Sequence, residues 1–319
     1  KRNYSGIMMN KNNVQMRDAF LSMLYQKAIG NPDIILLTND QGAISLDDFK
    51  KKLPNQFFNI GISEQNIISV AAGLVLSGKK VYVYSLLSFI FLRCYEQIKI
   101  DLCAMKLPVT IVGVGSGYSY SPDGPTHHAT EDISIMRALP NMTIYSPSDS
   151  NIVPALVDIT LKSKTPSYIR LDRQLLPLLY NKDHNLHEGF SILREGNDVT
   201  VISTGVMVHR ALEVAEELHE QSIQAKVIDF YRLKPIDVAA VTKILKRASK
   251  IVVLEEQTIN GGLGSIIAEI LVDSNVFIPL KRLAILDNMI FDYGSRDTLH
   301  KARGLDKMSI VHEITKLFK

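Results

Sequence analysis

The strongest constraint on the fold is a series of short, continuous apolar runs, each followed by a stretch with apolar residues at helical spacing. In the first half of the chain these runs are residues 34–38, 80–85, 109–114 and 165–171. Runs of this length are typical of strands buried on both faces of a parallel sheet, and parallel strands require crossover connections that are usually helical. The sequence therefore predicts an α/β fold with doubly wound, mainly parallel sheets.

A second set of alternating strands and helices follows a segment with no sustained periodicity. That segment, residues 175–195, contains Pro177 and the polar stretch NKDHNLHEG. Strands are expected beyond it at residues 198–203, 225–229 and 250–254. A chain of 319 residues is long enough for two cores. We therefore predict a first domain at residues 14–174, a linker at 175–195 and a second doubly wound domain at 196–319.

Composition limits the kinds of partner that the chain can bind. With 36 basic and 33 acidic residues, the net charge of +3 gives no electrostatic case for binding nucleic acid or a membrane surface. No apolar run reaches the length of a membrane span. Cys94 and Cys103 form neither a CxxC pair nor a set of metal ligands. Reduced thiols of this kind are typical of a cytoplasmic protein, and we expect the chain there.

The most informative segment is residues 57–77, FFNIGISEQNIISVAAGLVLS. A buried strand is expected at residues 57–60, a sharp exit at Gly61 and an apolar helix at residues 66–76, which places Glu64 at a strand-to-helix junction. Open α/β sheets bind ligands at such junctions. An acidic residue in the first turn of a helix is also stabilised by the helix dipole alone. The residue pattern by itself leaves both interpretations of Glu64 open.

Motifs along almost the whole chain resemble the transketolase superfamily of thiamine diphosphate enzymes. GISEQN, followed by an Ala-Ala-Gly helix, is similar to the segment that carries the superfamily's catalytic glutamate. DGPTH at residues 123–127, with an acidic helix start and RALPNM after it, is similar to transketolase itself. LEEQTINGGLGS and YGSRDTLHKARGLD are similar to the superfamily's carboxyl-terminal domain. The resemblance extends from about residue 14 to the end and preserves the family's order of motifs.

The resemblance implies three residues at the pyrimidine half of the cofactor. Glu64 would be the catalytic carboxyl group that hydrogen-bonds a pyrimidine nitrogen and thereby activates the thiazolium carbon. This chemistry requires a carboxyl group that holds or shares a proton near neutral pH, and an apolar pocket shifts a carboxyl pKa upward, in that direction. Phe89 would stack on the pyrimidine, with Phe91 as the alternative ring. The sequence predicts a single helix at residues 89–104, with Arg93 as a structural residue near its start. Asp40 corresponds to an aspartate near the cofactor and the partner subunit.

The resemblance also implies the substrate contacts. His127 would face the reacting carbon as a proton donor or acceptor, which suits the near-neutral pKa of an imidazole. Asp123 would hold a sugar hydroxyl, Arg173 would bind a sugar phosphate, and Arg17 is a second possible anion contact. Complete transketolases usually carry a phosphate-binding histidine at the head of this loop, where this chain has residues 115–117, Gly-Ser-Gly. The choice between a sugar phosphate and a free or nucleotide-linked sugar therefore remains open.

One family motif is absent from the sequence. Members bind the cofactor diphosphate through Mg²⁺ held by a GDG motif in an amino-terminal domain, and no GDG occurs here. The chain therefore resembles the carboxyl-terminal half of a split transketolase, a subunit with no metal site of its own. The expected partner is an amino-terminal subunit with GDG and Mg²⁺. A homodimer of this chain would lie inside a heterotetramer that transfers a two-carbon ketol unit in carbohydrate metabolism.

Other readings of the same motifs remain. A beta subunit of a 2-oxo acid dehydrogenase is also a separate chain of this size, but DGPTHHATED has the transketolase form. A deoxyxylulose phosphate synthase shares the GISEQ-like segment but normally keeps both halves in one chain. A catalytically silent scaffold subunit is the third alternative, and intact Glu64 and His127 argue against it.

Overall fold

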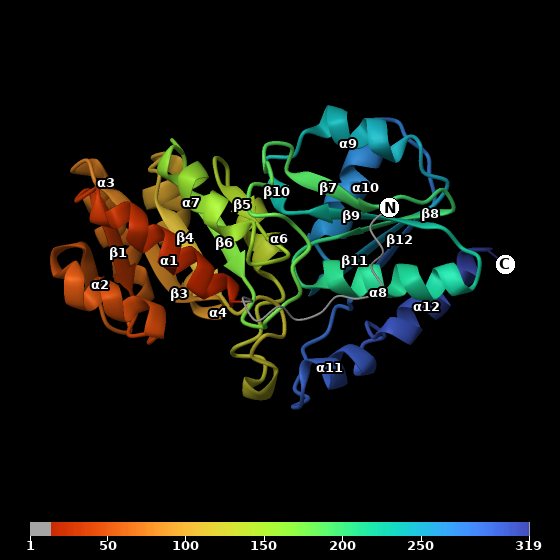
Figure 1. Cartoon of the computed structure of the whole chain (residues 1–319), viewed down its shortest axis with the longest axis horizontal. Coiled ribbons are helices and arrows are strands. Elements are labelled where there is room, and N and C mark those ends of the chain that lie inside the picture. The colour runs from red at the N-terminus through yellow and green to blue at the C-terminus, as the bar shows by residue number, and fades with distance from the viewer. Residues whose placement is uncertain (1–13, 319) are drawn as a thin grey trace. The chain divides into compact units, whose positions relative to one another are not determined.

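The computed structural model describes residues 14–318, which divide into two compact units (Figure 1). Unit 1 contains the described residues up to Ser116, together with Met136–Tyr145 and Asp149–His184. Unit 2 contains Gly117–Ile135, Ser146–Ser148 and the described residues from Asn185 onward. Each unit is built on its own sheet flanked by helices, which confirms the predicted α/β class with mainly parallel sheets.

The strands of unit 1 lie in the order β5-β6-β4-β3-β1-β2, and all their pairings are parallel. Their bounds are β1 Ile34–Thr38, β2 Phe57–Asn59, β3 Lys80–Leu86, β4 Thr110–Val114, β5 Thr143–Tyr145 and β6 Ser167–Leu171. Every residue of β1, β4 and β6 is buried. The continuous apolar runs of the sequence exist because helices cover both faces of these strands.

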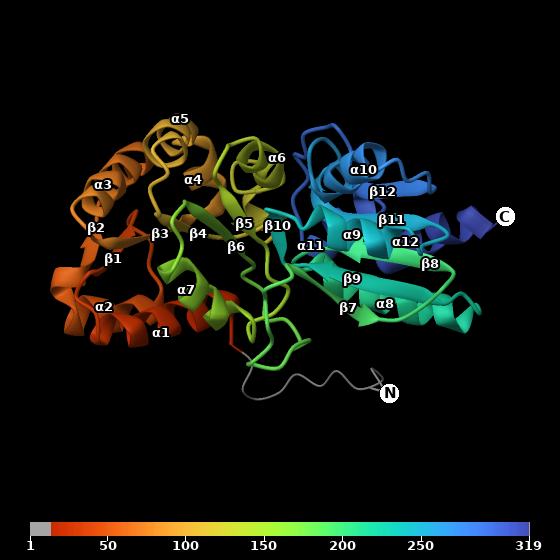
Figure 2. The same cartoon turned by 90° about the horizontal axis from the view of Figure 1, so that it is seen from above.

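Helices lie on both faces of this sheet, as Figure 2 shows. On one face α1 (Met16–Ile29) packs against α7 (Val153–Leu161). On the other face lie α3 (Glu64–Leu76), α4 (Leu87–Leu92) and α5 (Tyr95–Gln97). The short helix α2 spans Asp47–Lys52, and α6 spans Asp132–Arg137. Short 3-10 helices lie at Ile44–Leu46 and Pro54–Gln56 in unit 1 and at Ser121–Asp123 and Lys316–Phe318 in unit 2.

Two local predictions for unit 1 are wrong. The strand expected to be buried at residues 57–60 is an edge strand, β2, which pairs only with β1 and leaves Phe58 43% exposed. The single helix expected at residues 89–104 is interrupted after α4, and a π-helical segment, Ile98–Ala104, follows α5. Arg93 consequently caps the carboxyl end of α4, whereas the sequence placed it near a helix start.

Unit 2 contains a five-stranded sheet in the order β12-β11-β8-β9-β7. Its strands are β7 Phe190–Arg194, β8 Val199–Ser203, β9 Ala225–Phe230, β11 Ile251–Thr258 and β12 Leu280–Ile285. The pairings are parallel except for β7, which runs antiparallel to β9 and lies within the segment predicted as a linker. The short strand β10 spans Arg232–Lys234.

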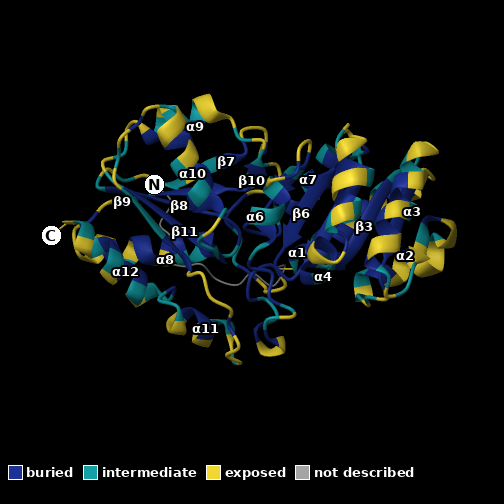
Figure 3. Cartoon of the chain, turned by 180° about the vertical axis from the view of Figure 1, so that it is seen from behind, coloured by how far each residue is buried: buried dark blue, intermediate teal, exposed yellow. Residues whose placement is uncertain are grey.

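The helices of unit 2 cover both faces of its sheet. Helices α9 (Val238–Leu245) and α10 (Leu263–Asp273) lie on one face, and α8 (Met207–Glu220) and α12 (Lys307–Thr315) pack together on the other (Figure 1). Helix α11 spans Arg296–Ala302. Figure 3 shows the buried strands and the exposed outer sides of the helices. None of the helices between residues 14 and 318 is both long enough and apolar enough to span a membrane.

Gly113 permits the close approach of α4 to the sheet of unit 1. It lies in β4, and a Cβ atom added there would be 1.9 Å from Leu87 Cδ1 and 3.3 Å from Leu87 Cα. Leu87 is the first residue of α4, the helix that carries Phe89. A side chain at Gly113 would therefore displace the start of this helix.

We predict that Gly113→Ala lowers the free energy of unfolding by about 1–3 kcal/mol, the usual cost of overpacking a core. Urea denaturation measures this difference. Gly30→Ala is the matched control, because a Cβ atom there meets nothing within 4 Å and the backbone φ is −92°. Equal urea midpoints for Gly113→Ala and Gly30→Ala would contradict the close approach.

Candidate active site

Glu64 is the first residue of α3, directly after the turn that leaves β2. Gly61 has a φ of +77°, a conformation that residues with a Cβ atom rarely adopt, and it turns the chain from the strand towards the helix. The Glu64 side chain is only 7% exposed. The sequence therefore delivers a nearly buried carboxylate to a helix amino terminus, where the helix dipole favours negative charge.

Arg93 links Glu64 to the predicted aromatic residue. Its Nη1 atom donates a hydrogen bond of 2.9 Å to Glu64 Oε1. The same guanidinium lies over the Phe89 ring, with Cζ 3.9 Å from the ring centroid. Phe89 is partly exposed, whereas Phe91 is completely buried in the core. Of the two rings that the sequence left open, Phe89 is therefore the one that a ligand beside Glu64 can reach.

A buried thiol follows this group in the chain. Cys94 is completely buried, and its thiol donates to the Ile90 carbonyl. Burial, with a smaller contribution from the nearby Glu64 charge, raises the Cys94 pKa to about 12. The thiol therefore stays protonated and neutral beside the carboxylate at physiological pH. Cys103 is buried as well, and neither cysteine forms a disulfide.

Asp40 lies at the carboxyl end of β1 and has a φ of +54°. Asn59, the last residue of β2, holds this turn in place. The Asn59 side-chain oxygen accepts hydrogen bonds of 2.9 Å from the backbone N–H groups of Asp40 and Gly61, and its amide donates to Asp40 Oδ1 at 3.1 Å. The sequence analysis did not identify Asn59, although its place at the end of a strand was a usable signal. Asp40 is exposed and aligned by a neighbouring strand.

The two candidate anion-binding arginines have different surroundings. Arg17, on α1, donates to Asp18 Oδ1 at 2.9 Å, and its side chain is 20% exposed. Arg173 is exposed just beyond the carboxyl end of β6. The preceding Asp172 fixes this strand end by accepting hydrogen bonds from the Ser116 hydroxyl at 3.1 Å and from the Gln174 N–H at 2.8 Å. Arg173 is the more accessible of the two for a substrate.

Asp123 and His127 lie on a tight loop of unit 2. Asp123 ends a 3-10 helix, and Gly124 follows with a φ of +75°. The Gly124 carbonyl accepts hydrogen bonds from the N–H groups of both His127 and His128. A hydrogen bond of 2.9 Å also joins Thr126 Oγ1 to His127 Nδ1. Asp123 is exposed and His127 partly exposed, whereas His128 is buried. The turn thus orients the two adjacent imidazoles differently.

Consecutive residues of β11 anchor the two ends of this loop. Glu256 Oε2 accepts a hydrogen bond of 3.0 Å from the Tyr118 N–H. Gln257 donates to the Ala129 carbonyl, and the Thr258 N–H donates to the Thr130 carbonyl. Sequence reasoning missed Glu256 and Gln257, although polar residues inside an otherwise apolar strand were a signal. The β11 strand therefore fixes the loop that presents Asp123 and His127.

The buried carboxylate of Glu256 is compensated by two neighbouring side chains, Arg296 and His300. Arg296 donates to both of its carboxylate oxygens, at 2.8 and 2.6 Å, and His300 forms a further hydrogen bond. Burial alone would raise the Glu256 pKa, but the positive charge of Arg296 and the hydrogen bonds from Arg296 and His300 outweigh it and lower the pKa well below the usual range. Gly117 is required beside it, because a Cβ atom there would lie 1.8 Å from Glu256 Oε2.

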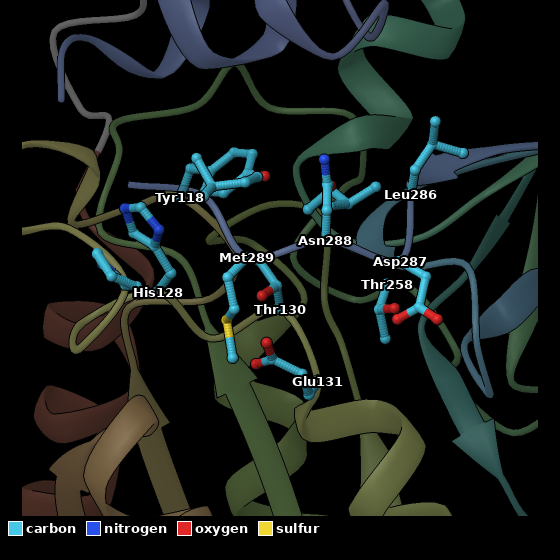
Figure 4. A pocket seen from close by; sticks show the side chains of 12 residues that line it. Tyr118, His128, Thr130, Glu131, Thr258, Leu286, Asp287, Asn288 and Met289 are labelled. Carbon is cyan, nitrogen blue, oxygen red and sulfur yellow. The ribbon is translucent and has the colours of Figure 1, made fainter. Parts of the chain in front are cut away.

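A polar pocket of about 310 Å³ adjoins this loop within unit 2 (Figure 4). One wall comes from the loop, with Tyr118, His128 and Glu131, and the other from the segment after β12, residues 286–290. Burial lowers the pKa of His128 and raises the pKa of Glu131, so both side chains favour their neutral forms more than exposed residues do. Among residues 14–318, no cluster of three or more His, Cys, Asp or Glu side chains could hold a metal ion.

The predicted site residues thus fall into two groups, one in each unit. Glu64, Phe89, Asp40, Arg173 and Arg17 belong to unit 1. Asp123 and His127 belong to unit 2. The structure joins Glu64 and Phe89 through Arg93, which the sequence analysis did not assign to the site.

Comparison with known proteins identifies the family. Residues 12–178 match the family described as "Transketolase, pyrimidine binding domain", and residues 189–310 match "Transketolase, C-terminal domain". The chain belongs to the transketolase family, and its predicted identity as the carboxyl-terminal half of a transketolase is confirmed.

Several relatives are similar along almost their whole length. An apulose-4-phosphate transketolase subunit of Phocaeicola vulgatus is 36% identical over 305 residues, which are 95% of this chain and 97% of the relative. The 6-deoxy-6-sulfo-D-fructose transketolase subunit SqwH of a Clostridium species is 35% identical over 94% of each chain. A solved structure described as a split gene transketolase, inactive beta4 tetramer, superposes with a TM-score of 0.86 at 34% identity, covering 95% of this chain and 98% of that one.

We predict that Glu256→Gln lowers the free energy of unfolding at pH 7 by about 3–5 kcal/mol, because it leaves the largely buried Arg296 charge uncompensated. The folded-state pKa of Glu256 is depressed. The contribution of Glu256 to the free energy of unfolding is therefore present above the unfolded-state pKa and is lost as the pH falls through the acid range. The difference between wild type and variant, measured by urea denaturation, should therefore narrow below about pH 4.5.

Glu213→Gln is the control for this measurement, because Glu213 is 55% exposed and pairs with Arg210 on the surface. Loss of that pair should cost about 0.2–1 kcal/mol. A Glu256 variant no less stable than the Glu213 variant would contradict the anchoring role of Glu256.

Proposed function

We propose that this chain is one subunit of a two-part transketolase, which transfers a two-carbon ketol unit from a ketose to an aldose. The observation that carries the proposal is the Glu64 carboxylate, 7% exposed at the start of α3, within the stretch that matches the pyrimidine-binding domain. A partly exposed aromatic ring, Phe89, is connected to it through one side chain, Arg93. A pyrimidine requires these two features, a carboxyl partner for a ring nitrogen and a flat apolar surface.

Glu64 and Phe89 fit the pyrimidine half of thiamine diphosphate, which supplies an electron sink for the two-carbon unit when it is bound. Glu64 would share a proton with the pyrimidine nitrogen, in surroundings that exclude most water and strengthen the hydrogen bond. Phe89 would hold the ring by stacking. Asp40, aligned by Asn59 at the end of β1, would contribute at the edge of the same site.

The histidine loop would handle the sugar. His127 is partly exposed, and we assign its imidazole, whose ring nitrogens can donate or accept a hydrogen bond, to the substrate's oxygen atoms. Asp123 would accept a hydrogen bond from a sugar hydroxyl. The hydrogen bonds between this loop and β11 support these roles, because proton transfer demands a fixed geometry.

We further propose that the ketose donor carries an anionic group at the end remote from the transferred unit. Apulose 4-phosphate and 6-deoxy-6-sulfofructose, named for two relatives, share that property while differing in phosphate and sulfonate. Arg173 is the better candidate for the anion, because its side chain is exposed at a strand end, whereas the Arg17 side chain is only 20% exposed. A guanidinium suits either oxyanion, since it offers two parallel donors.

Activity in this proposal depends on a second chain that supplies the diphosphate and Mg²⁺ site with a GDG motif. Two relatives are named as separate transketolase subunits, and a solved relative is described as an inactive tetramer of beta chains, which supports this dependence. We propose a heterotetramer with two copies of each chain, built around a homodimer of this one. Neither Cys94 nor Cys103 forms a disulfide, which suits a reducing compartment, and we propose the cytoplasm.

We predict that Glu64→Gln, assembled with its partner chain and thiamine diphosphate, slows hydrogen–deuterium exchange at the thiazolium carbon by about a hundredfold to ten-thousandfold. The substitution keeps the shape of the side chain but removes its titrating proton. Rapid-quench NMR measures the exchange rate.

His127→Ala is the contrasting variant, since its residue acts on the sugar and not on the cofactor. Exchange should stay fast in this variant while ketol transfer falls. An exchange rate in Glu64→Gln equal to that of the wild type would overturn the assignment of Glu64. Slow exchange in His127→Ala would overturn the assignment of His127.

A further inference from the structure

Arg93 directly follows α4 and contacts a nearly buried carboxylate. Its side chain is 46% exposed, yet its guanidinium reaches the nearly buried Glu64 at 2.9 Å. The backbone N–H of Arg93 bonds the Phe89 carbonyl at the end of α4, so Phe89 and Arg93 are one helical turn apart. Residues at this spacing lie on one side of a helix, which lets the guanidinium fold back over the ring.

The Arg93 guanidinium has the same two contacts that Glu64 and Phe89 would make with an aminopyrimidine. It is flat, it lies 3.9 Å from the Phe89 centroid, and it donates to a carboxylate oxygen of Glu64. A pyrimidine stacked on this face of Phe89 and bonded to this oxygen would need the same space. Arg93 and the cofactor ring therefore cannot make both contacts at once.

We propose that the Arg93 guanidinium occupies the aminopyrimidine site of the chain and competes with the cofactor ring for it. This inference rests on the proposed function, because it takes the roles of Glu64 and Phe89 from there. Arg93 compensates the Glu64 charge and covers the Phe89 ring while the ring site holds no ligand. Binding of the ring requires the guanidinium to move away towards solvent, which is possible because the Arg93 side chain is 46% exposed.

Competition of this kind has a consequence opposite to that of a purely structural residue. Removing a residue that merely shapes the pocket weakens ligand binding. Removing a competitor strengthens it, because the ligand no longer has to displace the guanidinium from Phe89 and Glu64. The sign of the change in affinity therefore identifies the role of Arg93.

The test uses the free aminopyrimidine alcohol that corresponds to the pyrimidine half of thiamine, titrated into the isolated full chain and followed by ligand-observed NMR. This probe carries no diphosphate and needs no metal. Arg93→Met, which keeps the length of the side chain but loses its charge and planar end, should bind the probe about three- to tenfold more tightly than wild type, as expected for losing a cation–π contact and a partly exposed ion pair.

Two further variants make the comparison specific. Arg93→Lys keeps the charge but not the flat guanidinium, so its affinity should lie between those of wild type and Arg93→Met. Arg247→Met replaces an exposed arginine on unit 2 and should leave the affinity unchanged. A crystal structure of the chain with the probe should show Arg93 displaced from Phe89.

The outcomes separate this inference from the proposed function. Equal, weaker or absent binding in Arg93→Met would overturn the competition by Arg93. If Glu64→Gln weakens binding of the probe in the same experiment, the assignment of the aminopyrimidine site to Glu64 is still supported. Binding that is insensitive to Glu64→Gln would count against the proposed site, whatever Arg93→Met does.

Discussion

The candidate site depends on a nearly buried carboxylate, Glu64, whose charge is compensated by the guanidinium of Arg93. A buried carboxylate without a partner is costly, so the helix amino terminus and Arg93 together make this position tolerable in the folded chain. The packing of α4 on the sheet positions this group. Gly113 lets α4 lie close to the sheet, and α4 carries Phe89 and is followed by Arg93. Packing and electrostatics together thus hold the Glu64 carboxylate in place.

Unit 2 applies the same physics to a different task. Its β11 strand carries a buried carboxylate, Glu256, which Arg296 and His300 compensate. Glu256 bonds one end of the loop bearing Asp123 and His127, and the next two residues of β11 bond its other end. The loop is polar and rich in glycine, so its geometry comes from these hydrogen bonds and not from a core of its own. In the proposed enzyme, β11 would therefore position the residues that handle the substrate.

The fold class, the order of the motifs and the positions of Glu64, Asp40, Asp123, His127 and Arg173 at strand ends or on loops could be anticipated, because apolar runs and turn residues are local signals. Contacts between residues that lie far apart in the sequence could not be anticipated. Arg93 meeting Glu64 and Glu256 meeting Arg296 depend on tertiary packing that no spacing encodes. The exposed edge position of β2 was missed because it depends on which strands lie beside it in the sheet. The interruption after α4 was missed because it also depends on tertiary packing.

The most direct test of the central claim is calorimetric titration of thiamine diphosphate with Mg²⁺ into this chain alone and into a mixture with a GDG-containing partner chain. Because the chain offers Glu64 and Phe89 for the pyrimidine, and its sequence contains no GDG motif, we expect tight binding and ketol transfer from an anionic ketose only in the mixture. Tight binding of the cofactor and magnesium by the isolated chain would contradict the account.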